Sequence, residues 1–565
     1  MTDQRPRNVS VLRVWLTAGI MLLGVVVLVA RAVNLQVTDT EFLQSQGEAR
    51  YLRTVDIPTV RGSILDRHGE PLAVSTPVDS VWAHPGELLQ AVDRLPELAD
   101  VLNMRVDVLE RRLTQRANRE FVWLRRRVHP ELAEQVKDLD VPGVSLQAEY
   151  RRFYPTAEVT AQVLGFTNVD DAGQEGLELA YNAWLQGEPG SKRVIKDRLG
   201  RVVQDIDLIR EARPGRDLQL TLDRRLQYLS FRALKQGIQR VGARSGSVVV
   251  MDVTNGEIVA MVNYPSYNPN NSMRAVGEGI RNRAMTDVLE PGSVIKPFAV
   301  AAAMEAGLAT PDMPIDTTPG TLTVSGHTIR DVRDFGLTTV EGLLVKSSNV
   351  GVVQLVLSME ARHLWGLYSR LGFGVVTGTG FPGESAGVLR DFERWRKLEQ
   401  ATLAYGYGLS VTPLQLVRAM AALADGGRLH QPTFIVGSDN PVQSVMDPAL
   451  AQEVVAMLEK ATGVEGTGQL ARVPGYRVAG KTGTTRLVGA GGYESRYVSS
   501  FGGLAPASRP RMAAVVVIND PTGDQYYGGQ VAAPVFGEVM SAALRLFSVP
   551  PDDLSTLMAA AGEEG

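Results

Sequence analysis

The most strongly apolar part of the chain lies near its N-terminus. Residues 14–30 (VWLTAGIMLLGVVVLVA) carry no charge, and Arg13 and Arg31 flank them. As a helix this run spans about 25 Å, slightly less than the hydrocarbon core of a membrane, and the flanking arginines can reach the headgroups. No amphipathic face is present, which disfavours a helix of a soluble core. The pattern predicts a transmembrane anchor over 14–30, after a cytoplasmic tail over 1–13.

The charges around this run predict its orientation. Arg5, Arg7 and Arg13 precede it, so the positive-inside rule places the N-terminus in the cytoplasm and the remainder of the chain on the other side. The alternative is a cleaved signal peptide, because residues 30–32 have the form A-x-A. The apolar run is longer than that of a usual signal peptide, however, and an arginine suits the cleavage site poorly. We therefore expect an uncleaved, single-pass membrane protein.

Past the anchor, the pattern of hydrophobic and polar positions changes near Pro214. Residues 31–213 are rich in charge and contain only short apolar runs, whereas 217–227 (DLQLTLDRRLQ) predict a strand that leads into a helix. Two β-branched runs then flank Asn255-Gly256, which is a strong signal for a β-hairpin. The change predicts one domain over 31–213 and another over 214–549.

The second domain is predicted to belong to the mixed α/β class. Residues 297–308 (PFAVAAAMEAGL) are apolar on nearly all sides and predict a buried helix. Three runs near the C-terminus, 476–484, 497–506 and 511–520, predict successive strands. Strands at both ends with helices between them indicate an antiparallel sheet flanked by helices. Residues 550–565 have no pattern that requires order, and we expect a flexible tail.

The amino-acid composition argues against several classes of function. The chain of 565 residues exceeds one ordinary domain, and a hydrophobic content of 44% is enough to build real cores. A formal net charge of −4 argues against a dedicated nucleic-acid binder. The chain has no cysteine, which excludes disulfides, cysteine-ligated metals and thiol catalysis. The six histidines are scattered without metal-ligand spacing, so we expect no metal and no cofactor.

Two short motifs could place a hydroxyl group beside a base. Ser293 and Lys296 are three residues apart, so on a helix they share one face. A lysine whose pKa is lowered by burial and by nearby cations can deprotonate such a serine. Ser347 and Asn349 follow in VKSSNVG, where a hydroxyl can relay a proton and an amide can hold a peptide. Taken alone, the first motif also fits an exposed pair, and the second more commonly marks a helix cap or turn.

A third motif lies within a predicted strand. Lys481-Thr482-Gly483-Thr484 offers a cation and two hydroxyls on one strand edge, which suits a carboxylate-bearing, peptide-like ligand. Gly483 allows another backbone to approach closely. The main-chain N–H groups of Ser293 and Thr484 are candidates to stabilise a developing oxyanion. Taken alone, this motif also fits a turn at the end of a strand.

The three motifs occur in a diagnostic order. S-x-x-K is followed by S-x-N 54 residues later and by K-T-G after another 134, which is the signature of penicillin-binding proteins and serine β-lactamases. With RGSILDRHGEPLAVSTP near residue 61, RNRAMTDVLEPGSVIKP around Ser293 and LAYGYGLSVTPLQL from residue 403, the chain resembles class B penicillin-binding proteins. Within that class it is similar to the septal, penicillin-binding protein 3 type of Gram-negative bacteria, from the anchor to about Val549.

The resemblance implies a role for each motif residue. Ser293 would be the acylated nucleophile and Lys296 its general base. Ser347 would pass the proton to the leaving D-alanine, and Asn349 would hold the substrate amide and Lys296. Lys481 would support the site electrostatically. The substrate, chiefly its terminal carboxylate, would be bound by Thr482, Gly483 and Thr484.

The same resemblance implies the fold and the activity. We expect a serine β-lactamase-like transpeptidase domain over 214–549 and, before it, an elongated mixed α/β pedestal over 31–213 that spaces it from the membrane. The first motif of the pedestal is matched by Arg61, Gly62, Asp66, Arg67 and Gly69. The implied activity is D,D-transpeptidation of peptidoglycan stem peptides at the division septum, with inhibition by β-lactams.

The implied location and partners are those of a division enzyme. We expect a protein of the inner membrane with its catalytic domain in the periplasm. Its partners would be stem peptides, β-lactams and division membrane proteins, among them a polymerising glycosyltransferase, and no nucleic acid. The alternatives are an elongation-type transpeptidase or a conditional second copy of the septal enzyme. A β-lactam sensor is disfavoured by the short cytoplasmic tail, and an inactive scaffold by the intact motifs.

One further pattern is an arginine run in the predicted pedestal. Seven arginines fall between Arg111 and Arg127. Runs of like charge usually form a solvated face, and docking of a partner is the alternative.

Overall fold

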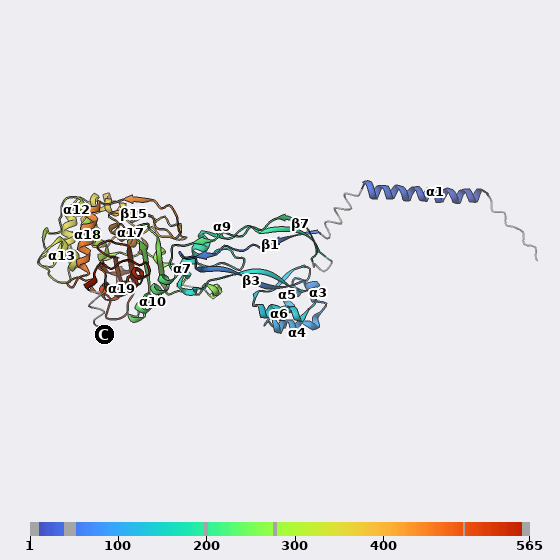
Figure 1. The fold of residues 1–565 in the computed structure, drawn as a ribbon, viewed down its shortest axis with the longest axis horizontal. Coiled ribbons are helices and arrows are strands. Elements are labelled where there is room, and N and C mark those ends of the chain that lie inside the picture. Colours follow the sequence, from blue (N-terminus) through green and yellow to red (C-terminus); the bar gives the residue numbers. More distant parts are fainter. Residues whose placement is uncertain (1–10, 39–51, 197–201, 275–278, 490–491, 556–565) are drawn as a thin grey trace, which may run out of the picture. The chain divides into compact units, whose positions relative to one another are not determined.

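The computed structural model describes residues 11–38, 52–196, 202–274, 279–489 and 492–555, drawn as a ribbon in Figure 1. The chain forms two compact units. The first unit comprises Met1–Thr59, Pro77–Tyr150 and Glu188–Pro214, and the second comprises Val60–Thr76, Arg151–Gly187 and Gly215–Gly565. The chain therefore enters the second unit three times, and the last entry, after Pro214, is where its composition changes.

The N-terminal helix α1 (Val11–Val33) continues into a short π-helical turn, η1 (Asn34–Thr38). The span Val11–Gln36 is long and apolar enough to cross a membrane, and none of its side chains is buried against the protein. It extends beyond both ends of the predicted run over 14–30. The first ten residues of the predicted tail, and residues 556–565 of the predicted C-terminal tail, lie outside the described residues.

The first unit combines two small sheet regions with short helices. Strands β1 (Leu52–Ile57), β6 (Gly190–Lys196) and β7 (Val202–Arg210) form an antiparallel sheet in the order β1-β6-β7. Strand β4 (Val122–Val128) pairs with residues 79–83 of β3 (Pro71–Ala83). The helices, which enclose a small core of their own, are α3 (Pro85–Leu88), α4 (Leu95–Val101), α5 (Val106–Thr114) and α6 (Pro130–Leu139).

The arginine run is divided between solvent and internal contacts. Arg111 and Arg119 are exposed, as a solvated face predicts. Arg126, in contrast, pairs with the carboxylate of Glu149 at 2.5 Å and lies over the ring of Trp123, 5.0 Å from its centroid. The solvated-face interpretation therefore describes only part of the run.

The second unit is built on a five-stranded antiparallel sheet with the order β10-β9-β19-β18-β17. Its strands are β9 (Ser245–Asp252), β10 (Ile258–Tyr264), β17 (Ala479–Gly489), β18 (Gly492–Ala505) and β19 (Met512–Asn519). The predicted hairpin at Asn255-Gly256 and the three predicted C-terminal strands are confirmed. Strand β17, which carries the K-T-G motif, is an edge strand, so one of its sides has unpaired backbone groups that can accept a ligand.

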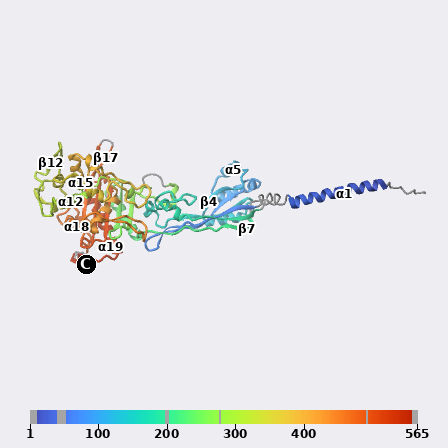
Figure 2. The ribbon, with the colours of Figure 1, turned by 90° about the horizontal axis from the view of Figure 1, so that it is seen from above.

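Helices cover both faces of this sheet because successive residues of a strand point to opposite sides. On β9, Val248 and Val250 pack into one core, whereas Val249 and Met251 pack into another. The first core contains helices α10 (Arg224–Arg240) and α19 (Gly528–Leu546). The second contains α12 (Lys296–Glu305), α17 (Pro413–Ala424) and α18 (Pro448–Ala461). Helices α12 and α18 are in contact and lie side by side in both views (Figures 1 and 2).

The remaining elements of the chain after β4 are short. Strand β5 (Val144–Phe153) pairs with β3 and begins in the first unit. The helices are α7 (Ala161–Leu164), α8 (Gly176–Ala180), α9 (Asn182–Leu185), α11 (Arg283–Thr286), α13 (Val340–Lys346), α14 (Asn349–Leu357), α15 (Ala361–Arg370) and α16 (Lys397–Leu403). The strands are β2 (Ile64–Leu65), β8 (Leu218–Gln219), β11 (Pro314–Asp316), β12 (Thr321–Val324), β13 (His327–Arg330), β14 (Leu337–Thr339), β15 (Arg428–His430) and β16 (Val442–Ser444).

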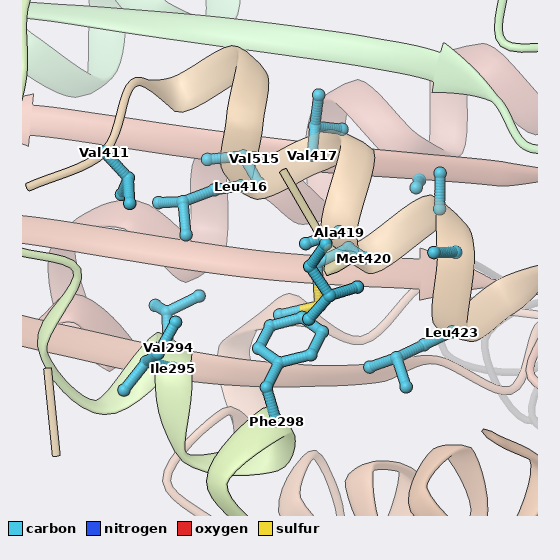
Figure 3. Close-up of a cluster of buried hydrophobic side chains, with 14 of the residues drawn as sticks. Val294, Ile295, Phe298, Val411, Leu416, Val417, Ala419, Met420, Leu423 and Val515 are labelled. Atoms are coloured by element: carbon cyan, nitrogen blue, oxygen red, sulfur yellow. The ribbon is translucent and has the colours of Figure 1, made fainter. Parts of the chain in front are cut away.

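The predicted buried helix is α12. Residues 298–303 are fully buried, as the apolar pattern predicted. Val294, just before this helix, and Phe298 lie among Met420 of α17 and Val515 of β19 (Figure 3). This packing holds the start of α12, and with it Ser293, firmly between a helix and the sheet.

A buried ion-pair cluster joins the early segments of the second unit. The Nε atoms of Arg61 and Arg152 donate to Oε2 and Oε1 of Glu178, each at 2.7 Å. All three side chains belong to residues no more than 4% exposed. The hydroxyl of Tyr154 also donates to Oε1 of Glu178 at 3.3 Å. Arg61, from the pedestal motif, thus has a structural partner in Glu178.

We expect Glu178→Gln to lower the free energy of unfolding by about 3–5 kcal/mol, because removing one partner leaves buried charges uncompensated. Urea denaturation of both proteins measures the difference. Glu453→Gln, at an exposed position on α18, is the matched control and should change the free energy by less than about 0.5 kcal/mol. A Glu178→Gln protein as stable as the wild type would show that the cluster contributes no stability.

Candidate active site

Ser293 lies in a 3₁₀ turn, η5 (Gly292–Ile295), that leads directly into α12. Gly292 has φ = +56°, and a side chain there would collide with the methyl group of Thr485, so the turn requires glycine. Ser293 itself is only partly buried, between the buried residues Gly292 and Val294. Its hydroxyl is therefore accessible while its backbone is fixed.

Lys296 is fully buried behind Ser293. Its Nζ donates to the main-chain oxygen of Ser347 at 2.7 Å, to Oδ1 of Asn349 at 2.7 Å and to Oγ of Ser347 at 3.3 Å. Among the hydrogen bonds of the described residues, none joins this amine to Oγ of Ser293, and such contacts often tighten only when substrate binds. The first and second motifs, 54 residues apart in the chain, are thus joined by one lysine.

The environment of Lys296 disfavours its charged form. Burial lowers the pKa of Lys296 well below its ordinary value, and the nearby charge of Lys481 lowers it further. The carboxylate of Asp331 opposes them by raising this pKa. The direction is the one that a general base at neutral pH requires.

Ser347 and Asn349 lie at the junction of two helices. Ser347 ends α13 in the left-handed conformation, with φ = +59°, and Ser348 caps α14 by accepting the N–H of Gly351 at 3.0 Å. The interpretation as a cap and turn is therefore correct, and the same geometry turns Ser347 and Asn349 toward Lys296. Ser347 and Asn349 therefore belong to a local turn and cap and also to the candidate site.

Asp331 is a residue of this site that the sequence did not reveal. Its carboxylate accepts the hydroxyl of Ser348 and the N–H groups of Asn349 and Val350, the last at 3.0 Å. A negative charge at the first turn of α14 is favourable because the helix N-terminus is positive. Asp331 therefore holds the S-x-N turn in place and also influences the pKa of Lys296.

The third motif lies on the edge strand β17. Lys481 is fully buried, and burial lowers the pKa of its amine to about 7. A Cβ at Gly483 would come within 2.8 Å of Val294 and would also collide with the hydroxyl of Ser500, so close packing beside Ser293 requires glycine here. Thr482 Oγ1 lies 2.8 Å from Thr467 Oγ1. The main-chain oxygen of Pro291 lies 3.0 Å from the position of such a Cβ, so another backbone does approach closely at Gly483.

The motifs meet at a pocket of about 620 Å³. Five of the eight predicted site residues line it: Ser293, Ser347, Asn349, Thr482 and Thr484. Lys296, Lys481 and Gly483 are buried and make no part of its lining. The sequence did not single out the other polar and aromatic residues of the wall, among them Tyr405, Tyr407, Thr467 and Tyr527. No group of three or more metal-ligating side chains is found in the described parts of the chain.

This arrangement can support acyl transfer. It presents one accessible hydroxyl, a buried amine of lowered pKa, a second hydroxyl that the amine contacts, and two threonine hydroxyls on an open strand edge. A nucleophile, a base and an anion-binding edge around one cavity are what attack on a peptide-like carbonyl requires.

Comparison with known proteins identifies the family. The penicillin-binding protein transpeptidase domain matches residues 246–541, and the penicillin-binding protein dimerisation domain matches 56–220. Peptidoglycan D,D-transpeptidase FtsI of Escherichia coli K12 is 43% identical over 549 residues, 96% of this chain and 93% of that protein. The probable peptidoglycan D,D-transpeptidase PbpC of Pseudomonas aeruginosa is 39% identical over 568 residues, 100% of both chains.

The solved structures agree with this match. Penicillin-binding protein 3 of Mycobacterium tuberculosis, in complex with aztreonam, superposes with a TM-score of 0.68 at 27% identity, over 88% of this chain and 98% of that one. The chain therefore belongs to the penicillin-binding protein transpeptidase family. Within it, the chain is of class B and of the penicillin-binding protein 3 type.

Proposed function

We propose that the chain is a septal peptidoglycan D,D-transpeptidase that acts through an acyl-enzyme on Ser293. The observation that carries this proposal is the buried Lys296, whose amine bridges Ser347 and Asn349 beneath a pocket that Ser293 opens into. The activity is the one named for the E. coli relative, which matches nearly the whole chain.

The geometry supports a two-step mechanism. In the first step, Oγ of Ser293 attacks the carbonyl of the penultimate D-alanine, and neutral Lys296 takes the serine proton. The main-chain N–H groups of Ser293 and Thr484 stabilise the oxyanion. Ser347, which Lys296 contacts, returns the proton to the nitrogen of the terminal D-alanine, which leaves. In the second step, the amine of an acceptor peptide attacks the ester, forms the cross-link and frees Ser293.

The substrate binds to the K-T-G strand and to Asn349. The hydroxyls of Thr482 and Thr484 receive the terminal carboxylate, and Asn349 holds the substrate backbone amide. Lys481 supports them with its charge; a pKa of about 7 leaves that charge partial in the empty site, and a bound carboxylate favours the charged form. Gly483 keeps the strand close to Ser293.

β-Lactams fit the same site as substrate mimics. Their ring carbonyl acylates Ser293, and their carboxylate takes the place of the substrate terminus at Thr482 and Thr484. The complex of the M. tuberculosis relative with aztreonam supports inhibition of this kind.

The proposed domain organisation, location and partners rest on the relatives and on the apolar N-terminal segment. We propose residues 1–13 as a cytoplasmic tail, 14–30 as the anchor, 31–213 as the pedestal, 214–549 as the transpeptidase domain and 550–565 as a flexible tail. In this proposal the catalytic domain lies in the periplasm and the pedestal docks division proteins, among them a polymerising glycosyltransferase. A conditional second copy of the septal enzyme is the second candidate. The full-length match to PbpC supports it, because PbpC is a probable D,D-transpeptidase that carries a different name from FtsI.

The direct test of the activity is a coupled assay. Purified protein, a synthetic stem peptide ending in D-alanyl-D-alanine and an amine acceptor should yield free D-alanine and a new amide in equal amounts. Release of D-alanine without amide would indicate a carboxypeptidase. Release of neither would contradict the proposal.

We expect a reporter that is active only outside the cytoplasm to be active when fused after Pro550, because Arg5, Arg7 and Arg13 hold the N-terminus inside. The same reporter fused at the N-terminus should be inactive. A mature protein that begins at Val33 would show instead that the apolar segment is a cleaved signal.

A further inference from the structure

The active-site pocket carries side chains that none of the roles proposed above uses. Leu470 belongs to the 3₁₀ turn η7 (Gln469–Ala471), lines the pocket and is 56% exposed. Lys346 also lines the pocket and is partly exposed. Thr467, just before the turn, contacts the K-T-G strand, because its Oγ1 lies 2.8 Å from Oγ1 of Thr482. The pocket therefore continues past Thr482 to residues outside the three motifs.

The turn η7 is held in place by residues other than Leu470. Ala471, the next residue, is fully buried in the core that contains α19. A Cβ at Gly529, near the start of α19, would come within 2.3 Å of the main-chain oxygen of Thr467, so this helix packs directly against the segment before the turn. The backbone at Leu470 is thus fixed while its side chain stays exposed. An apolar side chain held in this way on the wall of a pocket offers a surface to a ligand.

Lys346 brings a positive charge to the same pocket. No ion pair of the described residues includes its ammonium group, which lies over the ring of Phe335, 5.9 Å from the centroid. A lysine without a carboxylate partner beside a binding pocket favours a ligand that carries a carboxylate. The two unused side chains therefore suit a ligand that is apolar in one part and anionic in another.

The chemistry of the second step decides which part of a substrate lies here, and this rests on the proposed function. The terminal D-alanine of the donor leaves as an amine from the position beside Thr482, and the acceptor amine then attacks the same carbonyl carbon to form the same kind of bond. The acceptor nitrogen therefore takes the position of the nitrogen that left, where Ser347 can transfer its proton. Because the donor acyl group still occupies the side of Thr484, the remainder of the acceptor continues past Thr467 toward Leu470.

We propose that Leu470 and Lys346 form the binding subsite of the acceptor peptide. The methylene groups of the chain that carries the attacking amine pack on Leu470, and a carboxylate of the same peptide lies at Lys346. The neutral amine bonds to the carbonyl carbon, the ester bond to Oγ of Ser293 breaks, and the amine proton passes through Ser347 to that oxygen. Neither Leu470 nor Lys346 takes part in these bond changes.

The test measures how the acyl-enzyme divides between the acceptor and water. The protein receives a stem peptide ending in D-alanyl-D-alanine as donor and a second stem peptide as acceptor, below saturation, and mass spectrometry gives the ratio of new amide to hydrolysed donor. This ratio is set after acylation, so it does not depend on donor binding. In the Leu470→Ser and Lys346→Gln proteins it should fall about tenfold, because one loses apolar contact and the other a charged hydrogen bond.

Two control variants match these substitutions outside the pocket. Val464→Ser removes a side chain that is 75% exposed before the same turn and does not line the pocket. Lys397→Gln removes an exposed charge at the start of α16. Both should keep the wild-type ratio. An unchanged ratio in either the Leu470→Ser or the Lys346→Gln protein would overturn the inference.

An amidated acceptor assigns the charge to Lys346. When carboxamides replace all carboxylates of the acceptor peptide, the wild-type ratio should fall about tenfold, whereas the Lys346→Gln protein should treat the two acceptors alike. A wild type that does not distinguish them would contradict the role of Lys346.

Free D-alanine separates this subsite from the rest of the active site. As an acceptor it fills only the position of the leaving group and has no chain that continues past Thr467. The Leu470→Ser and Lys346→Gln proteins should therefore incorporate labelled D-alanine into the donor, and be acylated by benzylpenicillin, at the wild-type rates. A parallel loss of these reactions would show that the substitutions disturb the whole site, which contradicts the inference. If the wild type neither releases D-alanine nor reacts with benzylpenicillin, the proposed function itself fails.

Discussion

Ser293→Ala should abolish labelling by a fluorescent penicillin and leave the protein folded. Ser293 presents its hydroxyl to the pocket one helical turn before the buried amine of Lys296, and replacing O–H by H at a partly exposed position removes little packing. Labelling is measured by in-gel fluorescence, and folding by the thermal unfolding transition.

The matched control is Ser369→Ala, at an exposed position on α15 away from the pocket. It should label like the wild type. Stoichiometric labelling of the Ser293→Ala protein would show that another residue is acylated.

Lys296→Arg should reduce the rate of β-lactam acylation by about 10²–10⁴-fold, although it keeps the positive charge. A guanidinium does not lose its proton at any working pH, so the substitution removes the base while retaining the cation. Stopped-flow or quenched labelling gives the rate. Lys460→Arg, on the exposed side of α18, is the control and should have no effect.

The pH dependence separates a base from an electrostatic support. If Lys296 is the base, only its neutral form is active, so the acylation rate rises with pH through the pKa of Lys296 and is lost below it. Because burial and Lys481 lower that pKa, the acid limb should lie well below the value of about 10.4 for free lysine. A rate that is flat with pH, or near wild-type activity of Lys296→Arg, would assign the proton transfer to Ser347 or to water.

Local patterns predicted much of the second unit correctly. The hairpin at Asn255-Gly256, the three C-terminal strands and the buried helix α12 each have a strong local signal: a turn pair, short β-branched runs, and a helix-length run that is apolar on nearly all sides. The repeated passage of the chain between the two units has no such signal. It depends on long-range pairs such as β2 with β8, which join residues 64–65 to residues 218–219 in parallel. Two-residue strands leave no periodicity in a sequence.

Only some residues of the candidate site could be found from the sequence. The motif residues could be found because their types and order are distinctive. The structure places Ser293, Ser347 and Asn349 around one pocket, and the buried amine of Lys296 contacts the last two. Asp331 was missed because it lies in a charged segment, DVRD, that resembles a solvated loop. Its role depends on the fold, which brings it to the first turn of α14.

The aromatic wall of the pocket also depends on the fold. Tyr405 and Tyr407 lie near each other, with ring centroids 5.5 Å apart, and Tyr527 joins them from beyond β19. Exposed or half-buried tyrosines separated by more than a hundred residues give no common signal in a sequence. Their place around the cavity became visible only with the sheet and its helices in position.

The central claim is acylation of Ser293, and mass spectrometry of the intact protein tests it most directly. After incubation with benzylpenicillin, the whole population should gain the mass of one inhibitor molecule. Proteolysis should then locate that mass on the peptide that contains Ser293 and Lys296, at the serine. An unmodified protein, or an adduct on a peptide without Ser293, would contradict the account.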